Sequence, residues 1–155
     1  AEVELPAQAL NSLLLKAGMA YTEASFVSFK NGGGVGVDYD GRRLPFAPRI
    51  KTTLSAEHAM EIGSLTLRSS LGYSYADKQY SNPNNTAPNT IPRYELWNAR
   101  VAIEGGSKTR WSVALWGKNL ADRVYTTFNG LNALTTPRAI YGQPRTFGIT
   151  ATVDL

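Results

Sequence analysis

Apolar and polar residues alternate with a period of two along most of the chain, and the pattern is cleanest at the C-terminus. The apolar positions there are Phe147, Ile149, Ala151, Val153 and Leu155. Threonine, glycine and aspartate occupy the positions between them. Because successive side chains of a β-strand point to opposite faces, this segment predicts a strand with one apolar and one polar face.

Six earlier segments show the same alternation. They cover residues 2–5, 13–22, 49–57, 65–75, 97–104 and 110–115. The alanine- and leucine-rich stretch 7–20 would also pass as a helix by propensity, but Gly18 and the alternation over residues 13–21 favour a strand. We therefore expect an all-β chain of about seven antiparallel strands, each leading directly into the next.

The two faces of these predicted strands differ in composition. The polar face carries small and charged residues, and the charges of the strand interiors all fall on it. The apolar face carries aromatic residues mainly near strand ends, namely Tyr21, Tyr73, Tyr75, Trp97 and Trp111. Half-buried soluble sheets also alternate. However, an apolar band edged by aromatic girdles around a polar lumen is typical of a transmembrane β-barrel, so these five residues are expected at the membrane interfaces.

The connections between the predicted strands alternate strictly between short and long. The short ones are residues 7–11, 59–63 and 105–108, and the long ones are residues 30–45, 80–92 and 118–140. Outer-membrane barrels have short periplasmic turns and long extracellular loops. We therefore expect the three long loops outside the cell and the last strand ending in the periplasm. A soluble sandwich has no reason to keep every long loop at one end.

The amino-acid composition adds little to the fold prediction, but it excludes several kinds of chemistry. The 155 residues are 43% hydrophobic with a mean hydropathy of −0.24, which by itself indicates one soluble domain. No stretch approaches the ~18 apolar residues of a membrane-spanning helix, and the segment starting at Ala1 does not resemble a signal peptide. The absence of cysteine excludes disulfides and thiolate metal sites, and the single histidine, His58, makes a histidine zinc site or a Ser-His-Asp triad hard to build.

Four local segments add a resemblance to a known family. They are residues 43–48, 97–100, 116–125 and 141–148. In this order and spacing they resemble the C-terminal end of TonB-dependent outer-membrane receptors. The residues that match the family motif around the last two strands are Asn119, Leu120, Asp122, Tyr125, Gly142, Pro144 and Arg145.

The last strand has a further role in that family, because the barrel-assembly machinery recognises it. The corresponding signal here would comprise Phe147, Gly148, Val153 and Leu155. The family usually ends in an aromatic residue with another aromatic two positions earlier, and those places hold Leu155 and Val153. Position 121, often phenylalanine in the family, is Ala121.

The resemblance implies a receptor and transporter of the cell outer membrane that is not an enzyme and needs no cofactor of its own. Such receptors take up scarce, large solutes such as iron–siderophore complexes, and the TonB system supplies the energy through a plug domain inside the barrel. The expected partners are outer-membrane lipid and lipopolysaccharide, the TonB system and the barrel-assembly machinery. No nucleic-acid partner is expected.

The number of predicted strands is too small for such a barrel. Transporters of this kind have ~22 strands, and bacterial single-chain barrels have even strand numbers. An open sheet would expose two unpaired edges to lipid. We therefore interpret residues 1–155 as the C-terminal part of a receptor β-barrel, a fragment without the plug domain and the earlier strands. The alternatives are a passive porin-like barrel, a small barrel made by several copies, and a soluble β-sandwich that binds a ligand.

Charged side chains provide the candidates for contact with a solute. Those in or beside the long loops are Arg42, Arg43, Arg123 and Arg138. They could steer an anionic chelate by their field or face lipopolysaccharide, and the net charge of +4 fits both. The charges of the polar face are expected to pair with one another or with the plug, with a solute path as the alternative. They are Lys16, Arg49, Lys51, Arg68, Arg100, Glu104 and Arg110.

Three features of the loops have simple interpretations. The glycine-rich segment 31–36 lacks the Lys-Ser/Thr pair of a phosphate loop and predicts a flexible tip. The segment 38–41 resembles the start of a calcium loop, but the later acidic ligands are missing, which favours a solvated turn. The loop-end aromatic residues are expected to anchor the chain at the interface, with solute stacking as the alternative. They are Tyr80, Tyr94, Tyr125, Phe128 and Tyr141.

Overall fold

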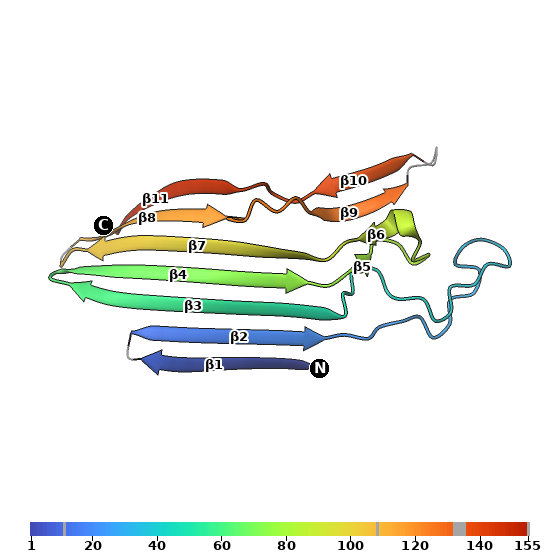
Figure 1. Ribbon diagram of the computed structural model, residues 1–155, viewed down its shortest axis with the longest axis horizontal. Coiled ribbons are helices and arrows are strands. Elements are labelled where there is room, and N and C mark those ends of the chain that lie inside the picture. The colour runs from blue at the N-terminus through green and yellow to red at the C-terminus, as the bar shows by residue number, and fades with distance from the viewer. Residues whose placement is uncertain (11, 108, 132–135, 155) are drawn as a thin grey trace.

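Seven antiparallel strands form one sheet, ordered β1-β2-β3-β4-β7-β8-β11 (Figure 1). The computed structural model describes residues 1–10, 12–107, 109–131 and 136–154. The sheet strands are β1 (Glu2–Leu10), β2 (Leu13–Tyr21), β3 (Ile50–Ile62), β4 (Leu65–Ala76), β7 (Tyr94–Gly105), β8 (Arg110–Lys118) and β11 (Thr146–Asp154). The prediction of an all-β antiparallel meander of about seven strands is confirmed.

Short elements interrupt two of the long connections. They are β5 (Gln79–Tyr80), the 3-10 helix η1 (Ala87–Asn89), β6 (Thr90–Ile91), β9 (Thr126–Leu131) and β10 (Pro137–Tyr141). β5 pairs with β6 and β9 pairs with β10. The prediction of long loops over residues 80–92 and 118–140 did not include these short strands. β5 and β6 have two residues each and cannot display an alternation, and β9 carries polar residues at adjacent positions.

Two of the three tight turns, β1–β2 and β3–β4, are shorter than predicted because the strands extend further. β1 continues to Leu10 through a register shift between Gln8 and Leu10, and β3 continues to Ile62. The β3–β4 turn then consists of two residues, with Gly63 at φ +63°, a conformation that glycine adopts without steric cost. Asn11 and Lys108, which belong to the other two predicted turns, lie outside the described residues.

The connections segregate to opposite ends of the sheet. Figure 1 shows the tight β1–β2, β3–β4 and β7–β8 connections at one end, where β11 also finishes, and all three long connections at the other end. We call these the turn end and the loop end. The long connections cover residues 22–49, 77–93 and 119–145. The predicted alternation of short and long links is confirmed, with longer bounds.

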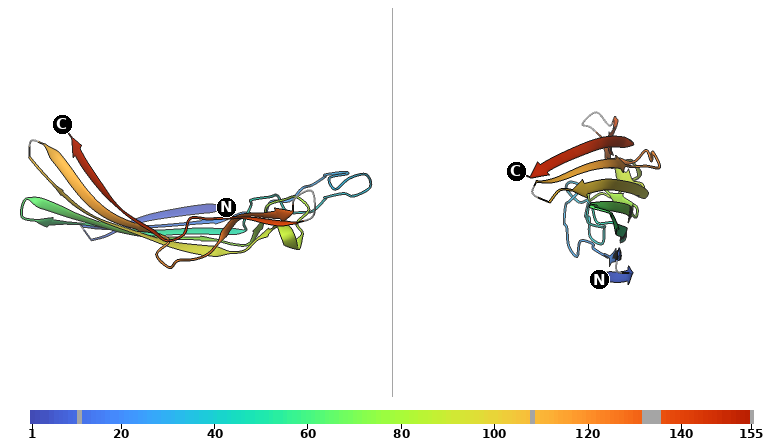
Figure 2. Two further views of the ribbon diagram at one scale, coloured as in Figure 1. Left: turned by 90° about the horizontal axis from the view of Figure 1, so that it is seen from above. Right: turned by 90° about the vertical axis from the view of Figure 1, so that its left-hand side faces the viewer.

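The sheet is a single curved layer that no second sheet covers (Figure 2). Its buried apolar strand residues are small, namely Ala76, Ala102 and Ala114 among the described residues. Large apolar side chains stay exposed on one face, as shown by Leu115 with 60% of its surface accessible. A soluble β-sandwich buries such a face against a second sheet, so that alternative is wrong. Across the described part of the chain, no helix has the length and apolar character needed to span a membrane.

The strand register separates an apolar face from a polar face. One row across the apolar face consists of Ala7, Leu15, Ala56, Leu71, Ala99, Gly117 and Phe147. The row beside it on the polar face includes Leu14, Glu57, Ser70, Arg100, Trp116 and Gly148. The period-two pattern of the sequence therefore continues across all seven strands without a change of face.

Candidate functional site

The polar face carries two cross-strand ion pairs. Lys16 Nζ lies 2.8 Å from Glu57 Oε1, and Arg68 Nε lies 2.7 Å from Glu104 Oε2. All four side chains are at least one-third exposed. Exposed pairs contribute little stability, ~0–1 kcal/mol each. Part of the predicted pairing among polar-face charges is thus observed.

Arg100, Trp116 and Lys118 lie together on this polar face. Arg100 is directly opposite Trp116 in the β7–β8 ladder. The ammonium of Lys118 lies 5.5 Å from the centroid of the Trp116 ring. An open hollow of about 370 Å³ borders Arg100 on the other side and is also lined by Leu14, Glu57, Arg68 and Ser70. Trp116 was not among the predicted site residues, although its even position in β8 places it on the polar face.

The residues of the predicted family motif gather where β8 leaves the sheet and β11 enters it. Asn119 is 3% exposed, and its side-chain amide donates to the carbonyls of Arg123 and Gln143 at 2.9 and 3.1 Å. Its carbonyl oxygen accepts from the Arg123 amide at 2.8 Å. Its own backbone N–H donates to Asn98 Oδ1 at 3.0 Å. This one side chain therefore joins the start of the third long connection to its end.

Further contacts continue this junction. Arg145 lies 3.5 Å from Asp122 and also donates its backbone N–H to that carboxylate at 3.2 Å. The backbone N–H of Gly142 donates to the carbonyl of Tyr125 at 2.9 Å, and the Tyr125 ring leaves no room for a Cβ at position 142. Tyr125 also stacks on Tyr94, with ring centroids 4.7 Å apart.

Leu120 and Pro144 contribute backbone hydrogen-bonding groups to the same junction. The N–H of Leu120 donates to the carbonyl of Trp97 at 2.8 Å. The carbonyl of Pro144 accepts from the Thr146 hydroxyl at 3.0 Å. All seven motif residues therefore lie in one structural junction.

The start of β11 packs reciprocally against β8. Phe147 lies opposite Gly117 on the apolar face, and Gly148 lies opposite Trp116 on the polar face. At each glycine, the aromatic ring across the ladder occupies the space of a Cβ. Val153 lies opposite Trp111 near the turn end, and Leu155 lies outside the described residues. Recognition of these residues by the assembly machinery stays a prediction.

Two of the four candidate solute-facing arginines make contacts within the loops. The Arg42 guanidinium donates to the carbonyl of Asn84 and lies 4.4 Å from the centroid of the Tyr39 ring. The Arg43 guanidinium donates to the carbonyl of Ala47 at 2.9 Å, and its backbone N–H donates to Asn85 Oδ1 at 2.7 Å. Both side chains are half-buried.

The other two candidates, Arg123 and Arg138, are exposed on the third connection. Arg42 and Arg43 lie in the first connection instead. Contact of any of the four with a solute stays a prediction.

Hydrogen bonds also join the long connections to one another. The Phe46 N–H donates to the carbonyl of Tyr80 at 2.8 Å. The Ser81 hydroxyl donates to the carbonyl of Asn129, and the Asn129 side chain donates to the carbonyl of Thr90 at 2.7 Å. Ile91, fully buried, lies in the middle connection. This network was not predicted, because its partners are far apart in the chain and belong to segments with no periodic pattern.

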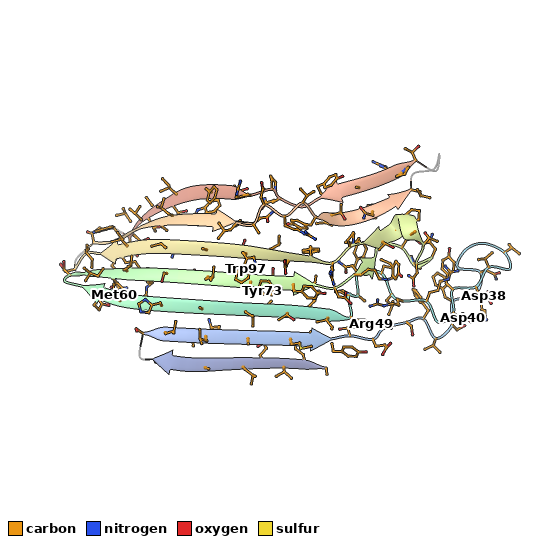
Figure 3. The ribbon with its side chains drawn as sticks, viewed as in Figure 1. Asp38, Asp40, Arg49, Met60, Tyr73 and Trp97 are labelled. Atoms are coloured by element: carbon orange, nitrogen blue, oxygen red, sulfur yellow. The ribbon has the colours of Figure 1, made fainter. Side chains whose placement is uncertain are left out.

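The glycine-rich tip of the first connection ends in an ion cluster rather than a metal site. Lys30 Nζ lies 2.9 Å from Asp38 Oδ2 and 2.6 Å from Asp40 Oδ2 (Figure 3 labels both carboxylates). The Lys30 hydrogen bonds lower the pKa of both carboxyls and raise the pKa of the lysine, and backbone N–H groups add to the lowering. Across the described residues, no group of three or more metal-binding side chains occurs. The turn interpretation of residues 38–41 fits this arrangement.

The five predicted interface aromatics form two groups at opposite ends of the apolar face. Tyr21, Tyr73, Tyr75 and Trp97 lie toward the loop end, and Trp111 lies at the turn end opposite Gly105. Tyr73 and Trp97 contact each other with ring centroids 4.7 Å apart (Figure 3). From Trp97 to Gly105 the strand extends roughly 26 Å at ~3.3 Å per residue. Their position at membrane interfaces stays a prediction.

Comparison with known proteins decides the family. Residues 1–120 match the family described as TonB dependent receptor-like, beta-barrel. This chain belongs to the TonB-dependent receptor β-barrel family. The resemblance predicted from the sequence motifs is confirmed. The sheet is therefore a segment of a transmembrane β-barrel, its apolar face is the lipid side and its polar face lines the lumen.

Solved structures of TonB-dependent receptors share this fold. The ferric yersiniabactin uptake receptor FyuA from Yersinia pestis superposes with a TM-score of 0.80 at 19% identity, covering 99% of this chain and 23% of that one. The ferric preacinetobactin receptor BauA from Acinetobacter baumannii gives 0.76 at 21% identity, covering 97% and 21%. The siderophore receptor PiuA from the same organism gives 0.69 at 23% identity, covering 98% and 20%. This chain thus spans about a fifth of their lengths.

The family consists of outer-membrane receptors of Gram-negative bacteria that transport solutes. A catalytic role is not part of that activity, which fits the prediction that the chain is not an enzyme.

Proposed function

We propose that this chain is the C-terminal part of the barrel of an outer-membrane receptor that takes up a scarce solute, such as an iron–siderophore complex, with energy from the TonB system. The observation that carries the proposal is the family match over residues 1–120. The three similar structures support it, because each is described as a siderophore receptor or uptake receptor.

The geometry supports an arrangement in which capture and passage use different parts of the chain. The long connections at the loop end face the outside of the cell and first meet the solute. Arg123 and Arg138 are exposed there and attract an anionic solute through their field. Arg42 and Arg43 hold the first connection against the middle one. The lumen face then lines the path of the solute.

The remaining partners follow from the same proposal. β1 and β11 are the open edges of the sheet, and open edges in lipid must be paired, which supports pairing with further strands. The family match supports a plug domain that contacts TonB. Lipid and lipopolysaccharide surround the apolar face. The barrel-assembly machinery recognises β11 during insertion.

Energised uptake is the test of this function. The full-length receptor is expressed in a Gram-negative strain that lacks its other iron receptors, and uptake of radioiron is measured with a panel of ferric chelates. Uptake is expected to stop when TonB is deleted or the proton-motive force is collapsed. Uptake that continues without TonB would instead support the passive porin-like alternative. Failure to transport any ferric chelate would refute the iron–siderophore assignment.

A further inference from the structure

The lumen face carries a cluster of one aromatic ring and two cations. Arg100, Trp116 and Lys118 share the polar face. Trp116 and Lys118 lie near the loop end of β8, and Arg100 lies opposite Trp116 near the middle of β7. Trp97 and Trp111 lie on the opposite, apolar face. Trp116 is therefore the tryptophan that this chain presents to the lumen.

The Trp116 ring is held in one orientation. Its indole N–H donates to the Thr150 hydroxyl of β11 at 3.1 Å. Gly148 lies directly across the ladder, and the ring occupies the space where a Cβ at position 148 would project. A ring fixed by a hydrogen bond and a glycine loses little conformational entropy when it binds a ligand.

The two cations beside this ring have no carboxylate partner among the described residues. Lys16 and Arg68, on the same face, form ion pairs with Glu57 and Glu104. Arg100 and Lys118 take part in none of the ion pairs formed by the described part of the chain, and both are exposed. The lumen face is therefore locally positive beside the indole.

Space for a ligand adjoins the cluster. The hollow of about 370 Å³ is lined by Arg100 together with Glu57 and Arg68, one member of each ion pair. This volume falls within the range of small-molecule sites, ~300–1,000 Å³. Arg100 borders the hollow and lies opposite Trp116, so a ligand that extends from the hollow past Arg100 reaches the indole.

We propose that Arg100, Trp116 and Lys118 form a subsite for an anionic chelate built on aromatic rings, whose iron ligands are catecholate or phenolate oxygens. The guanidinium and ammonium groups bind the anionic oxygens, and the indole stacks on the aromatic ring. A hydroxamate chelate has neither the aromatic ring nor the excess negative charge. This inference rests on the proposed function and names its substrate class.

Binding to the full-length receptor tests the subsite. The probes are the ferric complex of 2,3-dihydroxybenzoate, which is anionic and aromatic, and the ferric complex of acetohydroxamate, which is neutral and aliphatic. The variants are Arg100→Gln with Lys118→Gln, Trp116→Phe, and the conservative Arg100→Lys. Arg110→Gln is the matched control, because Arg110 lies on the same face at the turn end.

The paired Gln variant is expected to weaken binding of the catecholate chelate about ten-fold or more, as loss of a charged hydrogen bond predicts. Arg100→Lys is expected to retain most of the affinity and Arg110→Gln all of it. Trp116→Phe is expected to weaken binding by a smaller factor.

Three results would overturn the subsite. Unchanged affinity of the paired Gln variant would do so, as would a wild-type preference for the hydroxamate. The third is a loss of binding fully explained by a lower folded fraction, measured by heat-modifiable migration, which would assign the cations to contacts within the barrel. All three leave the proposed uptake function standing, because TonB-dependent transport is measured separately.

Discussion

The sheet and the loop end of this molecule are stabilised in different ways. In the sheet, the backbone ladders join seven strands, while both faces keep their side chains accessible and the buried apolar residues are alanines. In the long connections, Ser81, Asn89, Ile91 and Asn119 are buried and all but Ile91 use their side chains in hydrogen bonds. The sheet has no core of its own, whereas the connections build small ones.

The difference follows from the two solvents. Lipid contacts the apolar face of the sheet, so that face loses nothing by staying uncovered. The connections lie in water, where buried backbone groups need partners and burial of apolar side chains is favourable. High exposure therefore has a different meaning in the two regions. Leu115 on β8 is 60% exposed toward lipid, whereas Val124 in the third connection is 79% exposed toward water.

The largest expected difference between the two regions comes from placing a charge at each of these two exposed positions. Leu115→Arg is expected to destabilise the inserted barrel by about 2–4 kcal/mol, because the new charge enters lipid. Val124→Arg, at a position 79% exposed in the connection, is expected to change stability by less than ~0.5 kcal/mol. Denaturant titration of the full-length receptor in lipid vesicles measures both. Equal small effects would show that the apolar face does not meet lipid.

A second experiment addresses the loop end. Asn119→Ala removes the side chain that pairs with Arg123 and Gln143, and the groups left without partners are expected to cost about 2–3 kcal/mol. Hydrogen exchange of the third connection should accelerate while the sheet stays protected. Thr127→Ala, which removes one exposed hydrogen bond, serves as the control. Uniform acceleration across the sheet would contradict a separate local core.

Packing at Gly142 provides a second test of local packing in the third connection. Gly142→Ala pushes a methyl group into the Tyr125 ring and is expected to cost roughly 1–3 kcal/mol by overpacking. Gly72→Ala in β4 is the matched control, because the nearest atom to a Cβ there lies 3.9 Å away. Thermal unfolding of both variants measures the difference. Adding Tyr125→Ala should relieve part of the Gly142→Ala cost, and strict additivity of the two changes would contradict the contact.

The smallest expected effect is a pH response of the first connection. The lowered pKa of Asp38 and Asp40 means that their contribution exists above the usual carboxyl value of 3.8 and is lost as pH falls through the folded values. The raised pKa of Lys30 means that its contribution exists below the usual 10.5 and is lost as pH rises beyond it.

Proteolysis of residues 29–41 in the intact receptor measures this response. The cleavage rate is expected to stay low between these limits and to rise outside them. Lys30→Gln should make the rate higher throughout and flatten its dependence on pH. A wild-type rate that does not change below pH 3 would disprove the role of the ion cluster.

The long strands were predictable because their alternation is local. The face of the sheet on which each apolar residue from Phe147 to Val153 lies follows from its odd or even position in the strand. The same holds for β3, β4 and β7. The short strands in the connections were not predictable, since β5 and β6 have two residues each and cannot show an alternation.

The motif residues show a mixed outcome. The sequence placed Asn119, Gly142 and Arg145 in one family motif, but it did not show that Asn119 bonds to Gln143 or that Tyr125 fills the space beside Gly142. Nor did the loop arginines reveal their partners, because Arg42 and Asn84 are distant in the chain.

By itself, the sequence determined the all-β class, the two faces of each strand, the asymmetry of the connections and the family. These properties depend on local periodicity and on short motifs, which act over a few residues. The tertiary structure decided the contacts among the long connections, the packing of β11 on β8 and the grouping of Arg100, Trp116 and Lys118. Such contacts depend on strand register and on segments far apart in the chain, and no local pattern of side chains encodes them.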